Sequence, residues 1–168
     1  MAKIPHDPNE LLAVVDDNDN VIGKAPRKDV HAAGKLHCHA SVLIINNEGE
    51  ILLQKRKDNG KLDYSASGHF PYNVGYLDAA VRETEEELGL KIDKHKFVEV
   101  LKVMDNDTFV CLFEVKWDCK IEEMRIDPLE VASVRYYSIG EISEILSYAK
   151  KEDGFARIMR LYVKKRGV

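Results

Sequence analysis

The chain has 168 residues, of which 45% are hydrophobic and 32% are charged, so it can form one domain with a sizeable apolar core. Its formal net charge is -4, from 25 basic and 29 acidic residues, which argues against a broad nucleic-acid or membrane surface because both need a basic excess. The composition still allows a local basic pocket for a small anionic molecule.

The cysteine count and the N-terminal segment bear on the compartment. Cys38, Cys111 and Cys119 are odd in number and include no CxxC pair, which argues against a disulfide framework or a cysteine zinc site. The segment MAKIPHDPNE lacks the apolar core of a secretory signal, and no apolar run approaches the ~20 residues of a membrane span. We therefore expect a cytoplasmic protein with buried or half-buried thiols and with no nucleic-acid or membrane partner.

The first part of the chain is predicted to form strands joined by turns. Residues 1–36 are expected to form a β-hairpin extension, because apolar runs at 11–15 and 21–22 flank the turn-forming sequence DDNDN. The β-branched run at 39–46, the turn NNEGE and the returning run at 51–56 predict a second pair of strands. Residues 58–68, DNGKLDYSASG, are expected to be a loop.

The rest of the chain alternates helical and strand patterns. A helix is predicted over about 75–88, with Gly89 as its C-terminal stop. Ser138 and Glu141 form a capping box for a helix through about Ala149, and Gly154 is expected to break that helix before the last one begins. The remaining expected elements are strands at 97–103, 108–115 and 131–137 and a helix at 155–165. Interleaved strands and helices suggest a mixed sheet flanked by helices.

The segment RETEEELGL, residues 82–90, carries the most informative pattern. Glu83, Glu86 and Glu87 are spaced i, i+3 and i+4, so they share one helix face. Three such carboxylates repel one another, by roughly 0.2–0.5 kcal/mol per pair on an open helix, and a hard divalent cation would offset this because it prefers oxygen ligands. The alternative is a solvated acidic face. The other face is expected to pack on the sheet through Leu77, Val81, Thr84 and Leu88.

The wider spacing resembles the Nudix box, which reads Gly, five residues, Glu, seven residues, then Arg-Glu-apolar-x-Glu-Glu-x-Gly-apolar. The matching positions are Gly68, Arg82, Glu83, Glu86, Glu87, Gly89 and Leu90. Two positions depart, because Thr84 replaces an aliphatic residue and Val74 replaces the first Glu. The strand pair before the box and the segment LEVASVRYYSIGEI after it are also placed as in Nudix proteins, so the resemblance covers most of the chain.

This resemblance implies a single domain over residues 1–168, an α/β/α sandwich around a mixed β-sheet, with the box at 68–90. It also implies metal-assisted hydrolysis of a small-molecule diphosphate, namely a nucleoside diphosphate linked to another group. Nudix proteins often form homodimers, so a homodimer is a further expectation. The carboxylates of Glu83, Glu86 and Glu87 and the carbonyl of Gly68 would bind Mg²⁺ or Mn²⁺, and Arg82 would orient a neighbouring glutamate. The metal would neutralise diphosphate oxygens and lower the pKa of an attacking water.

The general base and the substrate contacts stay open at this point. Glu83 or Glu86 within the box could be the base, and three residues outside it could serve as base or extra ligand: Asp105, Asp107 and Glu130. Ordinary solvated turn residues are the alternative for those three. Lys55 and Arg56 end a strand and could contact phosphate, although alternation predicts that one of them faces the site. Phe70, Tyr72 and Tyr76 are candidates for stacking on the substrate, with packing around the loop as the alternative.

The N-terminal half is also similar to isopentenyl-diphosphate isomerases and their hydrolase relatives, through His31, His37 and the sequence SASGH that ends in His69. In the isomerases a catalytic Cys immediately precedes the Gly-His pair, and here that position is Ser67. The isomerases also lack the intact Arg-Glu…Glu-Glu pattern of the box, which this chain keeps. We therefore expect a Nudix pyrophosphohydrolase. One alternative, which rests on Val74, is a catalytically impaired Nudix domain that binds a nucleotide or metabolite, and the other is an isomerase. We expect His31, His37 and His69 to be ordinary strand and loop residues, and metal binding by the three is the alternative.

Overall fold

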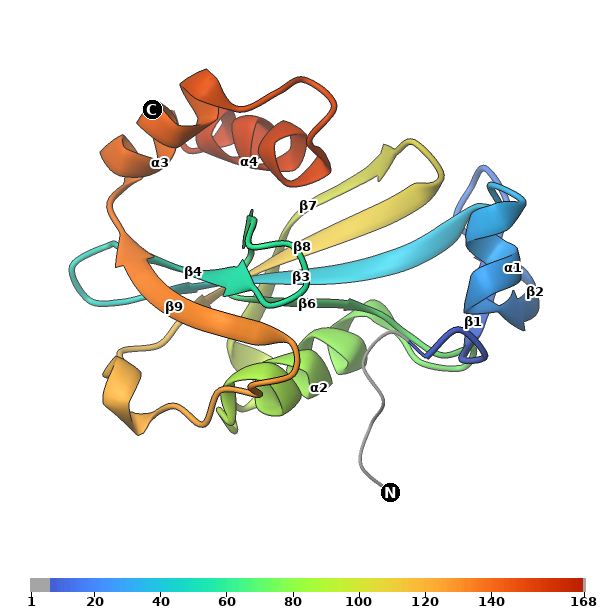
Figure 1. Ribbon diagram of the computed structural model, residues 1–168, viewed down its shortest axis with the longest axis horizontal. Coiled ribbons are helices and arrows are strands. Elements are labelled where there is room, and N and C mark those ends of the chain that lie inside the picture. Colours follow the sequence, from blue (N-terminus) through green and yellow to red (C-terminus); the bar gives the residue numbers. More distant parts are fainter. Residues whose placement is uncertain (1–6, 168) are drawn as a thin grey trace.

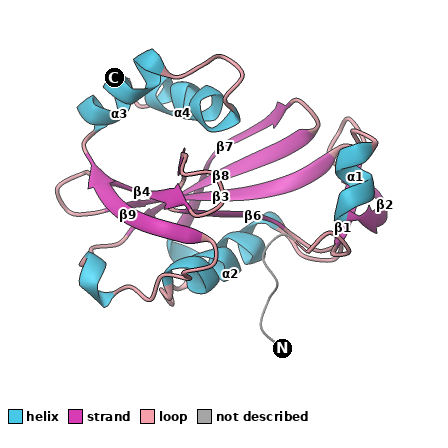
Figure 2. Cartoon of the chain, viewed as in Figure 1, coloured by secondary structure: helices cyan, strands magenta, loops and turns pink. Residues whose placement is uncertain are grey.

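The computed structural model describes residues 7–167, so the first six residues of the N-terminal segment lie outside the described part. The described chain forms a nine-stranded mixed sheet with helices on both faces (Figures 1 and 2). Helices α3 (Ile139–Tyr148) and α4 (Gly154–Lys165) cover one face, and α2 (Tyr76–Leu88) covers the other. The expected α/β/α sandwich is confirmed.

Strand β3 (His37–Ile45) is the centre of the sheet. One edge pairs in parallel with β8 (Thr108–Lys116) over the whole length of β3. The other edge is shared in turn by three antiparallel strands, β1 (Leu11–Val15), β6 (Ala66–His69) and β4 (Ile51–Arg56). The sheet is completed by β2 (Val21–Pro26) on β1, β5 (Leu62–Asp63) and β9 (Val131–Tyr137) on β4, and β7 (Phe97–Asp105) on β8.

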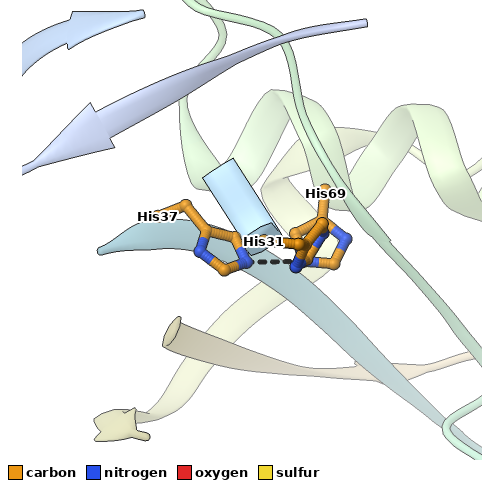
Figure 3. Close-up of side chains that lie close together, drawn as sticks. All are labelled: His31, His37 and His69. Carbon is orange, nitrogen blue, oxygen red and sulfur yellow. Dashed lines mark hydrogen bonds between the residues drawn. The ribbon is translucent and has the colours of Figure 1, made fainter. Parts of the chain in front are cut away.

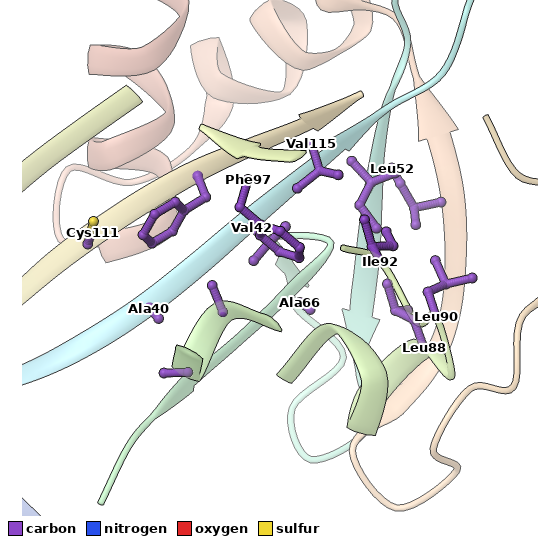
Figure 4. Packing of buried hydrophobic residues seen from close by; sticks show 14 of the residues in the cluster. Ala40, Val42, Leu52, Ala66, Leu88, Leu90, Ile92, Phe97, Cys111 and Val115 are labelled. Carbon is purple, nitrogen blue, oxygen red and sulfur yellow. The ribbon is translucent and has the colours of Figure 1, made fainter. Parts of the chain in front are cut away.

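The side chains of β3 alternate between two hydrophobic cores, because successive residues of a strand point to opposite faces. Ala40, Val42 and Ile44 belong to the core beneath α2, which Figure 4 shows, and Leu43 and Ile45 belong to the core beneath α3 and α4. Burial on both faces explains why this strand is an almost continuous apolar run in the sequence.

Two segments differ from the expectation. Residues 58–68 were expected to be a loop, but they contain β5 and the first three residues of β6. The small residues Ala66, Ser67 and Gly68 carry no strand pattern of their own, and pairing with β3 makes them a strand. The N-terminal hairpin is followed by a short helix, α1 (Arg27–Ala32), which no sequence signal predicted and which packs on the hairpin through Val30.

Helix α2 has the predicted length but a different buried face. Gly75 is its N-cap and Gly89 closes it in the left-handed conformation at φ 69°, as expected of a C-terminal stop. The face that packs on the sheet carries Ala79, Ala80, Glu83, Thr84, Glu87 and Leu88, whereas Leu77 and Val81 are half-buried at its margin. The expected separation of an acidic face from a sheet-facing face is therefore wrong. The small side chains of Ala79 and Ala80 let the helix approach the sheet, so Glu83 and Glu87 are enclosed.

The C-terminal part follows the sequence signals closely. The capping box of α3 is present, with Ser138 and Glu141 each bonding the backbone of the other. Gly154 is the first residue of α4 rather than a break before it, because the chain leaves α3 at Ala149 and Asp153 caps α4. Cys38 and Cys111 are buried, Cys119 is half-buried, and all three are free thiols. Two short 3-10 turns lie at Lys94–Lys96 and Ile121–Glu123. Within residues 7–167 no helix is long and apolar enough to cross a membrane.

Candidate active site

A cavity of about 280 Å³ opens between β6, the start of α1 and the sheet-facing side of α2. Its wall combines carboxylates, cations and imidazoles, among them Glu83, Glu130, Arg27, Arg56, His39 and His69. These six residues come from six separate segments of the chain, and the fold brings them together. A cavity with convergent polar groups of both charges is the usual form of a site for a small ionic molecule.

A close approach in this cavity joins Gly68, the glycine of the box, to Glu83 on α2. Gly68 is fixed in β6 by its pairing with Ala40 of β3, and Glu83 projects from α2 with 1% of its surface exposed. A Cβ at residue 68 would lie 2.6 Å from Cδ of Glu83 and 2.7 and 2.9 Å from its two oxygens. Glycine at residue 68 therefore makes the space that the Glu83 carboxylate occupies. Both residues line the same cavity.

Glu87 is the second buried carboxyl group and is 3% exposed. Its Oε2 atom accepts a hydrogen bond from Nε2 of Gln54 at 2.7 Å and another from the backbone N–H of Ser67 at 3.2 Å. Burial raises the pKa of Glu87 well above its ordinary value, and the nearby carboxylates of Glu83 and Glu130 raise it further. In addition, the Oε1 atom of Gln54 is buried and has no hydrogen-bond partner.

Arg82 forms an ion pair with Glu83 and approaches Glu86. Its Nη2 atom lies 2.7 Å from Oε1 of Glu83, and its Nε atom lies 3.8 Å from Oε1 of Glu86. The short contact is therefore with the adjacent Glu83 rather than at i+4. The side chain of Glu86 is 35% exposed, so it lies at the solvent-facing margin of the cluster.

This donor set fits a hard divalent cation. Two carboxyl groups are almost completely buried close to each other, which is costly unless a positive charge compensates them. The glycine at residue 68 leaves a space that any other residue would fill, and the orphaned Oε1 of Gln54 shows that the buried polar atoms are not all satisfied by protein groups. Carboxylate and carbonyl oxygens are the ligands that Mg²⁺ and Mn²⁺ prefer. The residues that would hold the ion are Gly68, Glu83, Glu86 and Glu87.

Two arginines lie on the cavity wall beside the carboxylates. Arg56 is held by Asp58 at 2.8 Å and by Asp63 at 3.1 Å, whereas Lys55 is exposed and does not line the cavity. Alternation along β4 thus brings one of the two cations to the site, as expected. Arg27, at the start of α1, was not predicted from the sequence; its Nη1 atom pairs with Glu10 at 3.3 Å.

Three histidines, His31, His37 and His69, gather at the edge of the cavity (Figure 3). One ligand nitrogen from each of His31, His37 and His69 lies within 4.8 Å of the others, a spacing that a metal ion could use. Two of these rings, His37 and His69, also form a hydrogen-bond chain. Nδ1–H of His37 faces the carbonyl of Lys35 at 2.8 Å, the two Nε2 atoms are 3.0 Å apart, and Nη2 of Arg27 is 3.1 Å from Nδ1 of His69. These tautomers follow from the network.

Two histidines of the cavity wall, His39 and His69, are held in the neutral form. Burial lowers the pKa of His69 well below its ordinary value, and burial with the charge of Arg27 lowers the pKa of His39 to about 3. Neutral imidazole accepts a hydrogen bond or binds a metal. The cavity wall near neutral pH is therefore charged through its arginines and carboxylates, not through its histidines.

The other predicted site residues lie in different places. Glu130 lines the cavity, but Asp105 and Asp107 line a neighbouring one. Phe70 is 3% exposed and packs edge-on against Tyr76 in the core, so its assignment as a substrate contact is corrected. Tyr72 is 38% exposed but lies outside the cavity, under the ammonium group of Lys24.

Val74 and Gln54 show two limits of the sequence pattern. Val74, which replaces the first Glu of the box, packs half-buried against the core beneath α2 and does not line the cavity. Gln54 was not predicted, although a polar residue inside the apolar run ILLQKR is a signal that could have found it. No comparable signal marks Arg27 or Glu10.

Comparison with known proteins identifies the family of the chain. The NUDIX domain family model matches residues 35–161, which is most of the chain. The chain belongs to the Nudix family. It thereby joins a family of hydrolases that generally use divalent metals, and its relatives include isomerases. The family match begins close to the end of the N-terminal hairpin extension, which is nevertheless part of the same sheet.

The curated relatives include both activities. An uncharacterized Nudix hydrolase of Yersinia pestis is 35% identical over 86 residues, covering 48% of this chain and 47% of that protein. Isopentenyl-diphosphate Delta-isomerase 2 of Photorhabdus laumondii is 37% identical over 86 residues, covering 48% and 49%. The match thus spans about half the length of these relatives. The human isopentenyl-diphosphate delta-isomerase 2 is 29% identical, with 82% of this chain and 73% of that protein covered.

Among solved structures, DR0079 from Deinococcus radiodurans matches with a TM-score of 0.76 at 20% identity and covers 90% of this chain and 98% of that one. The MutT protein from Methanosarcina mazei matches with a TM-score of 0.59 at 16% identity, covering 77% and 94%. At these identities the matches establish the fold alone, and they agree with the sheet and helices described above.

Proposed function

We propose that this Nudix protein hydrolyses a diphosphate linkage in a nucleoside-diphosphate derivative with the help of Mg²⁺ or Mn²⁺. The observation that carries the proposal is one cavity in which the buried Glu83 carboxylate and Gly68 lie together with Arg27 and Arg56. Such a cavity offers oxygen ligands for a cation and guanidinium groups for the diphosphate. Guanidinium groups match phosphate oxygens because two parallel N–H donors can bind one group.

The residues of the chain divide the work by position. A bound divalent cation neutralises diphosphate oxygens and lowers the pKa of the attacking water. Arg82 fixes the Glu83 carboxylate, while Gln54 and the Ser67 N–H fix Glu87. Arg27 and Arg56 orient the diphosphate, so that the remaining work is positioning and charge stabilisation.

Glu130 is the favoured general base among the residues outside the box. It lines the cavity, whereas Asp105 and Asp107 do not. Glu83 and Glu86 within the box remain the alternative, since a ligand of the metal can also contact the attacking water. Replacement of Glu130 by Gln separates these cases: a large fall in kcat with unchanged metal affinity assigns Glu130 as the base, and an unchanged kcat assigns the role to the box.

The proposal is tested with a panel of nucleoside-diphosphate derivatives at fixed Mg²⁺ or Mn²⁺. The wild-type protein is expected to release a nucleoside monophosphate or phosphate, and the variants Glu86→Gln and Glu87→Gln are expected to lose most of that activity. Glu85→Gln is the matched control, because Glu85 lies on the same helix but is exposed and pairs with Lys91. No turnover across the panel, or equal rates in all variants, would contradict the proposal.

A second candidate function is binding without turnover, and it rests on Val74. Nucleotide and Mg²⁺ would then raise the melting temperature without any product. Because Val74 packs on the core and lies off the cavity wall, we expect Val74→Glu to leave the hydrolysis rate nearly unchanged. A large gain in hydrolysis would instead show that the native site is impaired.

The third candidate is an isoprenoid-diphosphate isomerase, favoured by the gathered histidines and by the similarity to isomerases. Ser67 argues against it, because a hydroxyl group replaces the expected thiol on the cavity wall. Incubation with isopentenyl diphosphate measures it directly, for the wild type and for Ser67→Cys. Formation of the dimethylallyl isomer by the wild type would favour this function over hydrolysis.

Location and assembly are part of the same proposal. We place the reaction in the cytoplasm, as expected from the three free thiols. A homodimer is the proposed assembly, and sedimentation velocity of the purified protein measures it.

A further inference from the structure

A second cavity of about 420 Å³ adjoins the first and shares three wall residues with it, His39, Arg56 and His69. It lies between the turn that joins β7 to β8 and the first residues of α4. Its size falls in the range of roughly 300–1,000 Å³ that is typical of small-molecule sites. A diphosphate held by Arg56 would therefore have one of its two ends at the opening of this second cavity.

On the α4 side of the cavity, an ion pair joins α4 to the end of β7. Arg157 binds Asp105 through two contacts, Nε to Oδ1 at 2.7 Å and Nη2 to Oδ2 at 2.8 Å, and its Nη1 donates to the carbonyl of Lys151 at 2.9 Å. A Cβ at residue 154 would lie 3.2 Å from Oδ2 of Asp105, so Gly154 allows the close approach of helix and turn. Asp105 is thus a structural residue of this wall.

The chemistry of the second cavity differs from that of the first. One wall carries the half-buried ring of Phe155, which packs edge-on against the buried Tyr64 with ring centres 5.1 Å apart. Hydrogen-bonding side chains line the same cavity, among them Asn59, Asp107, Thr108, Glu152 and Asp153. Lys61 also lies on the wall, but the charges of Arg56 and Arg157 are matched by aspartates. Acceptors around one aromatic face suit a ring with hydroxyl groups, and the surplus of carboxylates disfavours another phosphate.

We propose that the second cavity binds the uncharged, hydroxyl-rich group at one end of the diphosphate, a sugar ring, which lies against Phe155. This inference rests on the proposed function and deepens it, because it names the class of group that the substrate carries beyond the nucleoside diphosphate. Phe155 and the carboxylates of the wall are specificity residues: they select a neutral sugar over a third phosphate.

The test compares kcat/KM for a nucleoside diphosphate sugar with kcat/KM for the triphosphate of the same nucleoside. The sugar derivative is expected to be preferred by at least about tenfold. Glu152→Lys adds a cation to the wall and should narrow that ratio roughly fivefold by improving the triphosphate. Glu144→Lys is the matched control, since Glu144 is exposed on α3, lies off the cavity wall and gives the same change in net charge. Phe155→Leu should raise KM for the sugar derivative while leaving kcat nearly unchanged.

The outcomes separate this inference from the proposed function. If the protein turns over but the ratio of kcat/KM for the sugar derivative to kcat/KM for the triphosphate is equal in Glu152→Lys and Glu144→Lys, the sugar site is overturned. A preference for the triphosphate or for isopentenyl diphosphate overturns it as well. Without any turnover the proposed hydrolysis fails, and calorimetric titration of the Mg²⁺-loaded protein with the sugar derivative decides the inference. Weaker binding of the sugar derivative to Phe155→Leu than to Glu144→Lys supports the sugar site, and equal binding to the two variants overturns it.

Discussion

The carboxylate of Glu83 lies directly over the α-carbon of Gly68, where a Cβ would come within 2.6 Å of the Glu83 Cδ atom. This contact couples the first residue of the box, in β6, to α2, the helix that we propose holds the metal. The backbone at Gly68 has no positive φ, so conformational freedom does not explain glycine at that position. The space beside the backbone is what glycine provides.

Replacement of Gly68 by Ala is expected to displace the Glu83 carboxylate and to weaken Mg²⁺ binding. We expect a loss of at least about tenfold in kcat/KM, comparable to the loss of an orienting contact at a metal site. Gly23→Ala is the control, because a Cβ there meets no atom within 4 Å. Isothermal titration with Mg²⁺ and steady-state kinetics measure both effects, and equal values for the two variants would contradict this account of Gly68.

Arg82→Lys is expected to weaken Mg²⁺ affinity about 10- to 100-fold while the protein stays folded. Lysine keeps the positive charge but cannot reproduce the 2.7 Å contact of Nη2 with Glu83 together with the approach of Nε to Glu86. Lys91→Arg is the conservative control, since its partner Glu85 is exposed on the same helix. A metal titration in which Arg82→Lys behaves like the wild type would remove Arg82 from the site.

Glu87→Gln is expected to stabilise the metal-free protein near pH 7 by about 1–2 kcal/mol while abolishing most activity. The folded-state pKa of Glu87 is raised above its unfolded value, so its contribution to stability is complete below an unfolded pKa of about 4.3 and is lost as the pH rises through the folded pKa. The advantage of the variant should therefore grow as the pH rises from about 4 to 7. Urea unfolding without metal measures it, and a variant less stable than the wild type at pH 7 would refute the prediction.

His39 is expected to make the protein less stable in mild acid. Its folded-state pKa of about 3 lies below the unfolded value of about 6.5, so its contribution to stability is complete above about pH 6.5 and is lost as the pH falls towards 3. At pH 5 the expected loss is up to about 2 kcal/mol. His39→Gln should reduce the difference between unfolding free energies at pH 7 and pH 5, whereas the exposed His95→Gln should not. Equal pH dependence in both variants would contradict the lowered pKa of His39.

Much of the fold could be predicted because its signals are local. The apolar run of β3, the stop at Gly89 and the Ser138–Glu141 capping box each depend on neighbouring residues in the chain, and each is present. Strand β6 could not be predicted, because its small residues become a strand through pairing with β3 alone.

The site was predicted in its composition but not in its orientation. The spacing of Glu83, Glu86 and Glu87 placed them on one helix face, but burial separates Glu86 from the other two. Whether a face meets solvent or a sheet depends on what packs there, here Gly68 and Gln54, and the helix sequence does not contain that information. Arg27 escaped prediction for the same reason, since α1 brings it to the cavity from a distant segment.

The most direct test of the central claim is the initial rate of diphosphate hydrolysis with Mg²⁺ in Glu83→Gln compared with Glu85→Gln. The two residues lie on the same helix and the substitutions are identical, but Glu83 is buried beside Gly68 and Glu85 is exposed. The account predicts that Glu85→Gln retains the wild-type rate, whereas Glu83→Gln loses at least about 100-fold. Equal rates in the two variants would show that the buried carboxylate does not serve the reaction.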